Sequence, residues 1–501
     1  MVGEVMDKYI LAVDLGTTNF KFALFNQSMK QIAQHRMPVT YLESDKFVEF
    51  DPHVYVEDCK KGMSQVLSDS NIDPLHVSLI ALTGQAESFV ITDDQGTVLS
   101  PGISWKDNRS EKQVSSISKV FQDVWYKTTG LPEVSTTWPV TKLLWIREHK
   151  PELFKRIRKV FMLKDYVTYH LTEAFVTEYS VFSFSGMMNL TKRTLWDEML
   201  DFIGLDKSVF PEFAEAGAIV GPLLPDVSKE LSFSSQTMVC IGALDHVAGM
   251  IGTGNIQKGK VTMSLGTVNA MAINISSFEK ENAQIECHSG AFPHSIIQLF
   301  VIDSGGVGIQ WFHDNFTPHI ELPDLDLAVE SQLGNENDII FLPYILGLNP
   351  PEYNALAKGV FFGFDVTDGP VQFARSIMES NCFLIRKSIN HLERQTSEIT
   401  EILAIGGAAN SPFFCQLLAD IIDKPVVTFK NPESTTLGAA MMGAVATHWY
   451  TSVEQAIKMS VERSHTYKPQ HQPYYEKKFD AFNKLYTHLF NTEKGDTLPW
   501  L

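Results

Sequence analysis

Two short segments in different halves of the chain have nearly the same sequence. Residues 14–19 read Asp-Leu-Gly-Thr-Thr-Asn, and residues 264–269 read Ser-Leu-Gly-Thr-Val-Asn. Each follows an apolar run and precedes alternating apolar residues, which predicts a strand, a tight turn and a second strand. Glycine lets a ligand approach the backbone closely, and neighbouring N–H groups and threonine hydroxyls can bind phosphate oxygens. One such hairpin is common, but its repetition predicts two related domains that face each other across one polyphosphate.

Length and charge narrow the class of protein further. A chain of 501 residues is expected to hold two or more domains. Its net charge of −18 disfavours nucleic acid and anionic lipid as partners. No apolar run approaches the roughly 20 residues of a membrane helix, and residues 1–7 contain no apolar signal core. The five cysteines are scattered without metal or disulfide spacing, so we expect a cytoplasmic protein.

Hydrophobic periodicity outlines the elements between and after the two hairpins. We expect a three-strand meander over 8–37, a strand, turn and strand over 77–92, and a short strand over 402–405. Helices are expected over 53–68, 139–149, 371–392, 412–422 and 435–449, with Ser411 as an N-cap and helices in the last forty residues. A run of small residues over 242–254 precedes the second hairpin and marks the inter-domain crossing. We therefore expect domains at 1–252 and 253–501, the second carrying the nucleotide.

Two carboxylates are candidates for roles in the reaction, one at a metal ion and one as a proton acceptor. Asp14 ends the first strand beside the first Gly-Thr turn, so it is a candidate to orient Mg²⁺ on a nucleotide, the alternative being an Asp that caps a turn. Asp245 lies among small and apolar residues, an expensive setting for an idle charge. It is a candidate to accept the proton of an attacking hydroxyl, and the alternative is a solvated loop Asp.

Four further segments are ambiguous by themselves. Gly406-Gly407-Ala408-Ala409-Asn410 is a turn on which a base or ribose can lie, and residues 305–311 form another glycine-rich start to a helix. Gln85-Ala86-Glu87 and Trp105-Lys106-Asp107-Asn108-Arg109 offer the polar groups and the aromatic ring with which proteins recognise polyols. Core packing of Trp105 and a surface ion pair of Asp107 with Arg109 are the alternatives.

These features together resemble the FGGY carbohydrate kinases, which belong to the superfamily of actin, hexokinase and the Hsp70 ATPase. Pro139-Val-Thr-Lys142-Leu-Leu-Trp145-Ile-Arg-Glu148-His149 resembles the family's first signature, and Thr137 departs from it at the opening position. Gly359-Val-Phe-Phe-Gly363-Phe364, followed by Gln372-Phe373 and residues 376–379, resembles the second, with Phe364 in place of a smaller aliphatic residue. The resemblance extends over nearly the whole chain. It implies an α/β fold of two actin-like (ribonuclease H-like) domains with a cleft between them.

The resemblance also implies roles for individual residues. Asp245 matches the catalytic base and, with Asp14, is expected at the metal. The expected ATP-binding residues are Thr17, Thr18, Lys21, Gly266, Thr267, Gly306, Gln310, Gly406, Gly407 and Asn410. The expected substrate-binding residues are Gln85, Ala86, Glu87, Trp105, Asp107 and His246.

The substrate is less constrained than the chemistry. Glycerol kinases carry Gln-Arg-Glu where this chain has Gln85-Ala86-Glu87, so the missing arginine argues against glycerol. Xylulokinases usually show Gln-Met-His at that place, and neither the Met nor the His is present. The pattern favours a small sugar or polyol, a ketopentose such as xylulose first, and gluconate or another sugar acid next.

The sequence therefore predicts a kinase that uses ATP and Mg²⁺ to phosphorylate a hydroxyl of a small sugar or polyol. Two alternatives keep the fold without the chemistry: a non-catalytic ATP-binding switch and a sugar-binding regulator. The expected partners are small molecules, with no nucleic acid and no membrane. The oligomeric state stays open, a homodimer included.

Overall fold

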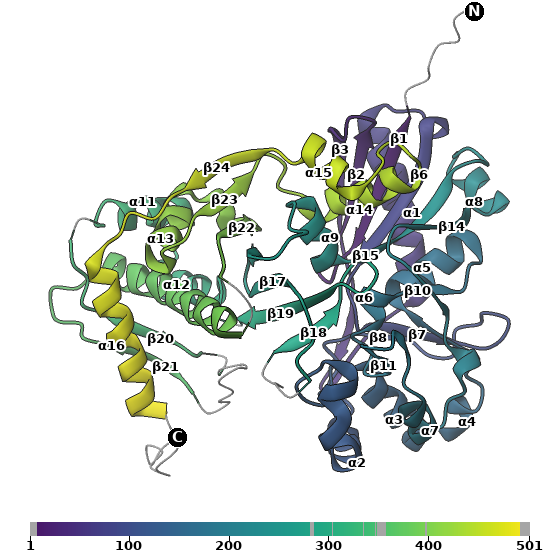
Figure 1. Cartoon of the computed structure of the whole chain (residues 1–501), viewed down its shortest axis with the longest axis horizontal. Helices are drawn as coiled ribbons and strands as arrows, with labels where there is room; N and C mark the ends of the chain where they lie inside the picture. The colour runs from purple at the N-terminus through teal and green to yellow at the C-terminus, as the bar shows by residue number, and fades with distance from the viewer. Residues whose placement is uncertain are drawn as a thin grey trace, which may run out of the picture. The chain divides into compact units, whose positions relative to one another are not determined.

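The computed structural model describes residues 8–280, 285–302, 304–333, 335–345, 347, 357–395 and 398–490. It divides into two compact units, and many of their elements are labelled in Figure 1. Unit 1 comprises Met1–Ile256, Ile275–Gln298 and Glu433–Val461. Unit 2 comprises Gln257–Asn274, Leu299–Pro432 and Glu462–Leu501. The chain therefore passes back and forth between the units, and a segment late in the sequence belongs to unit 1.

Unit 1 mixes strands and helices along its length. Its strands are β1 (Tyr9–Leu15), β2 (Asn19–Asn26), β3 (Gln31–Pro38), β4 (Leu42–Ser44), β5 (Phe47–Phe50), β6 (Val77–Gly84), β7 (Phe89–Thr92), β8 (Gly102–Ile103), β9 (Lys159–Met162), β10 (Val176–Glu178), β11 (Met188–Asn189), β12 (Thr194–Leu195), β13 (Glu212–Ala214), β14 (Ala218–Pro222), β15 (Met238–Leu244) and β18 (Glu286–Ser289). Its helices are α1 (Pro52–Ser70), α2 (Glu111–Thr129), α3 (Pro139–His149), α4 (Pro151–Phe154), α5 (Leu163–Thr172), α6 (Tyr179–Phe182), α7 (Asp197–Ile203), α8 (Pro225–Glu230), α9 (Asp245–Gly252), α14 (Ser434–Ala446) and α15 (Val453–Ser460).

The main sheet of unit 1 has the strand order β14-β15-β6-β1-β2-β3. The meander β1-β2-β3 is antiparallel, as expected from the sequence, whereas β1, β6 and β15 run parallel to one another. A second sheet has the order β4-β5-β8-β7-β9. The strands β6 and β7 thus lie in different sheets, although the sequence places them on either side of one turn.

Helices cover both faces of the main sheet. Leu11, Val13, Ile80 and Leu82 belong to one buried apolar cluster together with residues of α1 and α5. Neighbouring side chains of a strand point to opposite faces, and on the second face Gly443 of α14 lies against Leu79 and Ala81. The helix α14 therefore completes the core of unit 1 from far along the chain, and it also packs against α9.

Unit 2 also mixes strands and helices. Its strands are β16 (Lys260–Leu265), β17 (Asn269–Ile275), β19 (Ile296–Ile302), β20 (Ile340–Pro343), β21 (Gly359–Phe362), β22 (Glu401–Ile405), β23 (Val426–Phe429) and β24 (Arg463–Tyr467). Its helices are α10 (Val307–Phe316), α11 (Leu322–Glu330), α12 (Pro370–Gln395), α13 (Pro412–Ile422) and α16 (Pro473–Phe490).

The hairpin predicted twice is present twice. In unit 2, β16 pairs antiparallel with β17 and parallel with β22, as β1 pairs antiparallel with β2 and parallel with β6 in unit 1. The same core of hairpin and parallel neighbour thus recurs, which is the α/β, actin-like fold expected. Ser411 caps α13 by accepting the backbone N–H of Phe414, and Pro412 opens that helix.

The expectation for the end of the chain was partly wrong. Residues 463–467 form the strand β24, which pairs with β23 at the edge of the sheet, and α16 is the helix that follows it among the residues described up to 490. Its alternating sequence, Arg-Ser-His-Thr-Tyr, is polar enough to hide a strand from a hydrophobic pattern. The rest of that expectation, over 491–501, lies outside the described residues. Within the described part of the chain, no helix has both the length and the apolar character to span a bilayer.

Candidate active site

Three candidate residues emerge at one edge of the main sheet of unit 1. Asp14 on β1 pairs in register with Thr83 of the parallel strand β6, and Gly84 of β6 pairs with Leu244 at the end of β15. The carboxyl ends of β1, β6 and β15 therefore coincide, and Gln85 and Asp245 follow directly after β6 and β15. Ligands of open α/β sheets bind outside this edge.

Asp14 is buried, with 3% of its surface exposed. Its Oδ2 lies 3.6 Å from Lys21 Nζ on the neighbouring strand, while its Oδ1 has no hydrogen-bond partner. Burial raises the pKa of Asp14 to about 7, Lys21 opposes this effect, and repulsion from Asp245 and Glu433 adds to it. A buried carboxylate with an unpartnered oxygen is an expensive group that a bound cation would stabilise.

Glu433 completes this charged group and was not predicted from the sequence. It precedes α14, and its carboxylate lies 3.5 Å from Lys21 Nζ and also pairs with Arg36 on β3. Lys21 thus lies between two carboxylates, and both raise the pKa of its ammonium against the effect of burial. Glu433 is hundreds of residues from Asp14 in the chain and belongs to no motif, so only the fold could reveal it.

Asp245 is the first residue of α9 and is half-buried. It is therefore not the solvated loop residue that was the alternative. The backbone N–H of His246 donates to Asp245 Oδ1 at 2.6 Å, so the carboxylate is held at the N-terminus of the helix. The preceding strand end is fixed because Lys164 Nζ donates to Gly242 O at 3.0 Å and Leu244 N donates to Ser180 Oγ at 2.8 Å.

Hydrogen bonds connect the first Gly-Thr turn to two other candidate residues, Trp105 and Gln85. Trp105 Nε1 donates to Thr17 Oγ1 at 3.0 Å, and Thr17 Oγ1 donates to Gln85 Oε1 at 3.4 Å. The amide of Gln85 also lies 3.5 Å from Gly16 O and accepts from Ser88 Oγ at 3.0 Å. Gln85 is buried, so its contacts hold the turn in place. Thr18 is exposed at the tip of the turn.

The segment around Trp105 presents one side chain and buries another. The indole of Trp105 is 36% exposed, whereas Asp107 is fully buried. Both oxygens of Asp107 bind Arg109, at 2.8 Å to Nε and 2.7 Å to a terminal nitrogen, and Oδ2 also accepts the N–H of Val48. Asp107 therefore forms a buried ion pair that holds this segment. Ala86 is also buried, at 3% exposure.

Three charged residues act on Glu87, and sequence reasoning assigned no role to two of them, Glu286 and Lys142. It is half-buried, has a left-handed backbone (φ 61°) and makes no hydrogen bond through its side chain to the described residues. Burial, Glu286 and Asp245 raise its pKa to about 8, and Lys142 opposes them. Lys142 is fully buried and donates to Ser104 O, Trp105 O and Thr137 O at 2.8, 3.3 and 3.0 Å. Lys142 lies within the quoted signature, but its partners become evident only in the fold.

In unit 2 the second Gly-Thr turn lies against the glycine-rich start of α10. The N–H of Gly306 donates to Gly266 O at 2.8 Å, and the N–H of Val307 donates to Thr267 O at 3.1 Å. A Cβ on Gly306 would lie 2.9 Å from Gly266 O, so the two backbones touch. Thr267 is exposed. Gln310 lies one turn into α10, where its backbone N–H donates to Gly306 O at 3.0 Å and its side-chain amide donates to Asp314 Oδ1 at 2.7 Å.

The Gly406-Gly407 turn joins this group from the neighbouring strand. Gly406 has φ 90°, and a Cβ there would lie 2.7 Å from Leu265 O at the end of β16. Gly407 is exposed, and a Cβ on it would meet nothing within 4 Å, so open space lies over this glycine. Asn410 is exposed at the end of the short 3₁₀ turn Gly407–Asn410. Unit 2 thus brings together Gly266, Thr267, Gly306 and Gly406.

The residues of unit 1 fit a magnesium ion that shares its ligands with phosphate. No cluster of three or more His, Cys, Asp or Glu side chains able to bind a metal occurs in the described residues. Protein-bound Mg²⁺ commonly has one or two carboxylates and takes its other ligands from phosphates and water. Asp14, with its unpartnered oxygen, fits that role, and Asp245 lies within electrostatic range of it.

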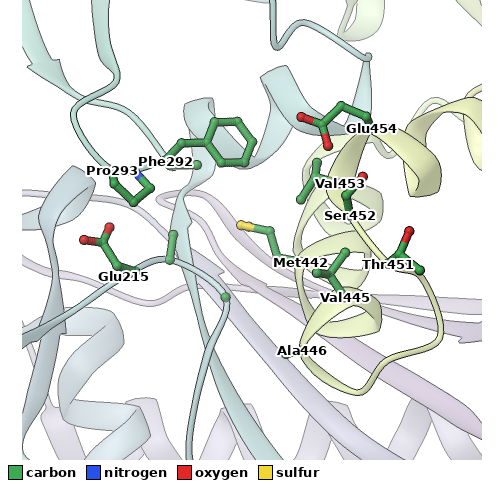
Figure 2. Close-up of a pocket in the computed structure, with 13 residues that line it drawn as sticks. Glu215, Phe292, Pro293, Met442, Val445, Ala446, Thr451, Ser452, Val453 and Glu454 are labelled. Atoms are coloured by element: carbon green, nitrogen blue, oxygen red, sulfur yellow. The ribbon is translucent and has the colours of Figure 1, made fainter.

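A cavity of about 390 Å³ occupies another part of unit 1 (Figure 2). Met442, Val445 and Ala446 of α14 form one wall, and Phe292 and Pro293 lie across from them. Glu215 and Glu454 lie at its border. None of the predicted site residues lines this cavity, so it is separate from the candidate site.

Comparison with known proteins decides the family. The family model described as "FGGY family of carbohydrate kinases, N-terminal domain" matches residues 9–252, and the corresponding C-terminal domain matches residues 292–447. The chain belongs to the FGGY family of carbohydrate kinases. As a member, this FGGY kinase is a sugar kinase, a phosphotransferase that takes ATP as a substrate and a small sugar as the acceptor.

Relatives of this FGGY kinase have several substrate names. It is 28% identical to the xylulose kinase of Bacillus subtilis (strain 168) over 490 residues, covering 96% of this chain and 97% of that one. It is 26% identical to the gluconokinase of the same organism over 464 residues, with 88% of each chain covered. The crystal structure of ligand-bound xylulose kinase from Lactobacillus acidophilus superimposes with a TM-score of 0.89 at 24% identity, covering 97% and 99% of the two chains. This last likeness confirms the fold.

Proposed function

We propose that this FGGY kinase transfers the γ-phosphoryl group of ATP to a hydroxyl of a ketopentose, xylulose being favoured, with Mg²⁺ as the metal. The observation that carries the proposal is the convergence of Asp14, Gln85 and Asp245 at the carboxyl ends of three adjacent strands. The relatives named xylulose kinase support the choice of sugar, since they cover nearly the whole chain.

The proposed chemistry follows from the position of Asp245. A half-buried carboxylate at the start of α9 accepts the proton of the attacking hydroxyl, and the fixed end of β15 keeps it in place. Thr17, Thr18, Gly266 and Thr267 supply hydroxyls and backbone N–H groups to the phosphates. Lys21 adds positive charge beside Asp14. Asp14 would hold Mg²⁺, which when bound neutralises charge on the phosphates.

The residues proposed at the sugar fall into an accessible group and a buried group. Glu87 and the exposed ring of Trp105 offer a carboxyl group and an aromatic face to a polyol. His246 is half-buried beside Asp245 and is proposed as a further contact. Gln85, Ala86 and Asp107 are buried, so we propose that they act by holding the shape of the site. The alternative substrate is a sugar acid such as gluconate, as in the gluconokinase relative.

Replacing Asp245 tests the proposed base. We expect Asp245→Asn to reduce kcat with xylulose by about a hundredfold or more, the scale of general-base effects. ATP binding, measured by calorimetry, should be retained. The control is Asp94→Asn, which changes an exposed turn residue of the same unit and should leave the rate unchanged.

A panel of acceptors separates the remaining alternatives. A coupled ADP-release assay with xylulose, ribulose, gluconate and glycerol should give the highest kcat/KM with a ketopentose. Higher kcat/KM with gluconate would replace the proposed substrate by a sugar acid. ATP binding without turnover of any acceptor would instead favour the non-catalytic switch, and unchanged turnover in Asp245→Asn would refute the role of that residue.

A further inference from the structure

Resting on the proposed function, we propose that Thr83, Lys164 and Ser180 are positioning residues for Asp245. They hold an irregular end of the strand β15, and this strand end directs the carboxylate of Asp245. No sequence motif marks these three residues. Their side chains are fully buried, so their effect on Asp245 passes through the backbone of β15.

The end of β15 contains a bulge beside β6. Ile241 pairs with Leu82 and Leu244 pairs with Gly84, so β15 has one more residue than β6 over this stretch. A bulge interrupts the ladder of backbone hydrogen bonds and changes the direction of the residues beyond it. Asp245 follows Leu244 directly and begins α9. The bulge therefore helps to set the direction of the Asp245 side chain.

Two buried side chains bind the backbone carbonyl groups at the bulge. Lys164 Nζ from α5 donates to Gly242 O at 3.0 Å. Thr83 Oγ1 from β6 donates to Ala243 O at 2.6 Å. Gly242 and Ala243 are themselves buried, and a buried carbonyl group without a partner is destabilising. These two side chains therefore supply hydrogen bonds that the interrupted ladder does not, and they stabilise the bulge.

A third hydrogen bond holds the next peptide group. Leu244 N donates to Ser180 Oγ at 2.8 Å, and Ser180 Oγ donates to the Glu178 carboxylate at 2.8 Å. A hydroxyl group has one proton, so its donation to Glu178 leaves a lone pair for Leu244 N. Glu178 is fixed in turn, because it accepts the backbone N–H groups of Ser180 and Val181 at 2.7 and 2.8 Å. The residue before Asp245 is thus anchored to the capped start of α6.

The charge of Lys164 is balanced within the same network. Its Nζ lies 3.5 Å from Asp165 Oδ1 and 4.0 Å from Glu178 Oε1. All three groups are buried, so removal of Lys164 would leave two carboxylates in the interior without their cation, which is strongly destabilising. Thr83 and Ser180 each contribute one neutral hydrogen bond to the bulge. Variants of these two residues therefore test the bulge with the least damage to the core.

Replacing Thr83 by valine tests the proposal against a matched control. Thr83→Val keeps the shape of the side chain and removes the donor to Ala243 O. Thr237→Val removes an equivalent bond at the opposite end of β6 and β15, where the buried Thr237 Oγ1 donates to Val77 O at 2.7 Å. We expect Thr83→Val to lower kcat with xylulose about tenfold, the effect of a buried carbonyl that loses its partner, with KM for ATP unchanged. Thr237→Val should lose similar stability in urea and retain kcat.

Three further variants make the test independent of a single substitution. Thr83→Ser keeps the hydroxyl and should retain most of kcat. Ser180→Ala removes the acceptor of Leu244 N, so it should lower kcat as Thr83→Val does. Its control is Ser185→Ala, which removes the acceptor of the Met187 N–H from another buried serine and should retain kcat. Ser180→Ala decides the question if Thr83→Val does not fold.

The outcomes separate this inference from the proposed function. A normal loss of rate in Asp245→Asn, together with equal kcat in Thr83→Val and Thr237→Val, would overturn the positioning role alone. A loss of kcat that Thr83→Ser fully shares would overturn it too. The same holds for a rise in KM with kcat unchanged, because a displaced base affects the chemical step. Unchanged turnover in Asp245→Asn would refute the proposed base itself, and the positioning role with it.

Discussion

At the scale of single residues, Asp14 should make the stability of the protein depend on pH. Its pKa is raised from 3.8 to about 7, so between these values the folded state binds more protons at Asp14 than the unfolded state does. The free energy of unfolding must then fall as the pH rises through this window. The whole effect is on the order of 4 kcal/mol at most, because one pKa unit corresponds to about 1.4 kcal/mol.

We therefore expect Asp14→Asn to flatten this pH dependence. Urea unfolding without metal or nucleotide, measured between pH 4 and pH 8, should show a smaller loss of stability in the variant and a more stable variant at pH 8. Its kinase rate should nevertheless fall, because the variant lacks the carboxylate proposed to hold Mg²⁺. A variant with the pH slope of wild type would show that Asp14 ionises as easily when folded as when unfolded.

The residues of the site also show where sequence reasoning ends. Asp14 and Asp245 were identified because each stands in a distinctive local setting, a Gly-Thr turn and a run of small residues. Glu433 has no such setting, since it reaches the pair of Asp14 and Lys21 from a distant segment. Lys142 was visible in a signature, but its three carbonyl partners depend on how two separate segments meet, the one at Ser104 and Trp105 and the one at Thr137. The roles of residues in distinctive local segments could be predicted from the sequence, whereas the convergence of distant segments could not.

At the scale of elements, the close packing of α9 and α14 depends on glycine. A Cβ on Gly438 would lie 1.8 Å from the backbone oxygen of Ala248, and one on Gly252 would lie 1.8 Å from that of Ser434. Backbone atoms cannot move aside as side chains do, so Gly438→Ala must push the two helices apart. Because Asp245 begins α9, the displacement should reach the proposed base.

We expect Gly438→Ala to cost about 3 kcal/mol or more of stability, as overpacking of a core does, and to lower kcat. The matched control is Gly443→Ala on the same helix. Its Cβ would meet chiefly the end of the Leu79 side chain, at 2.5 Å, which can rotate. Both changes raise the helix propensity by the same amount. Comparing the two variants by chemical denaturation and by kcat therefore isolates the effect of the clash between the two helix backbones. Equal losses would show that the helices separate easily.

Helices and strands could be predicted where the sequence carries clear local signals such as apolar periodicity or a capping residue. The meander, α3 and the capped α13 were foreseen because apolar periodicity, a proline at the first turn and a serine cap coincide with their ends. The strand β24 was missed since its alternating residues are polar. The helix α14 was foreseen as a helix rich in glycine and alanine, but no pattern indicated that it belongs to unit 1.

At the scale of the whole molecule, the path of the chain makes unit 1 depend on its late segment. Residues 433–461 supply α14, which covers one face of the main sheet, and Glu433, which pairs with Lys21 and Arg36. A fragment ending at residue 256 contains the whole sheet β14-β15-β6-β1-β2-β3 but lacks this cover. Leu79 and Ala81 would then be exposed to water, and exposed sheet faces of this kind favour aggregation.

We therefore expect fragment 1–256 alone to be poorly folded, and expect co-expression with fragment 257–501 to restore a folded complex. Circular dichroism, gel filtration and xylulose kinase activity would measure the recovery. A split at residue 94, in the exposed turn between β7 and β8, is the matched control. It leaves α14 on one fragment together with β15 and α9. Independent, cooperative unfolding of fragment 1–256 at wild-type stability would contradict the proposal that α14 is part of the core of unit 1. The same result would mean that the packing of Gly438 against Ala248 forms only after that unit has folded.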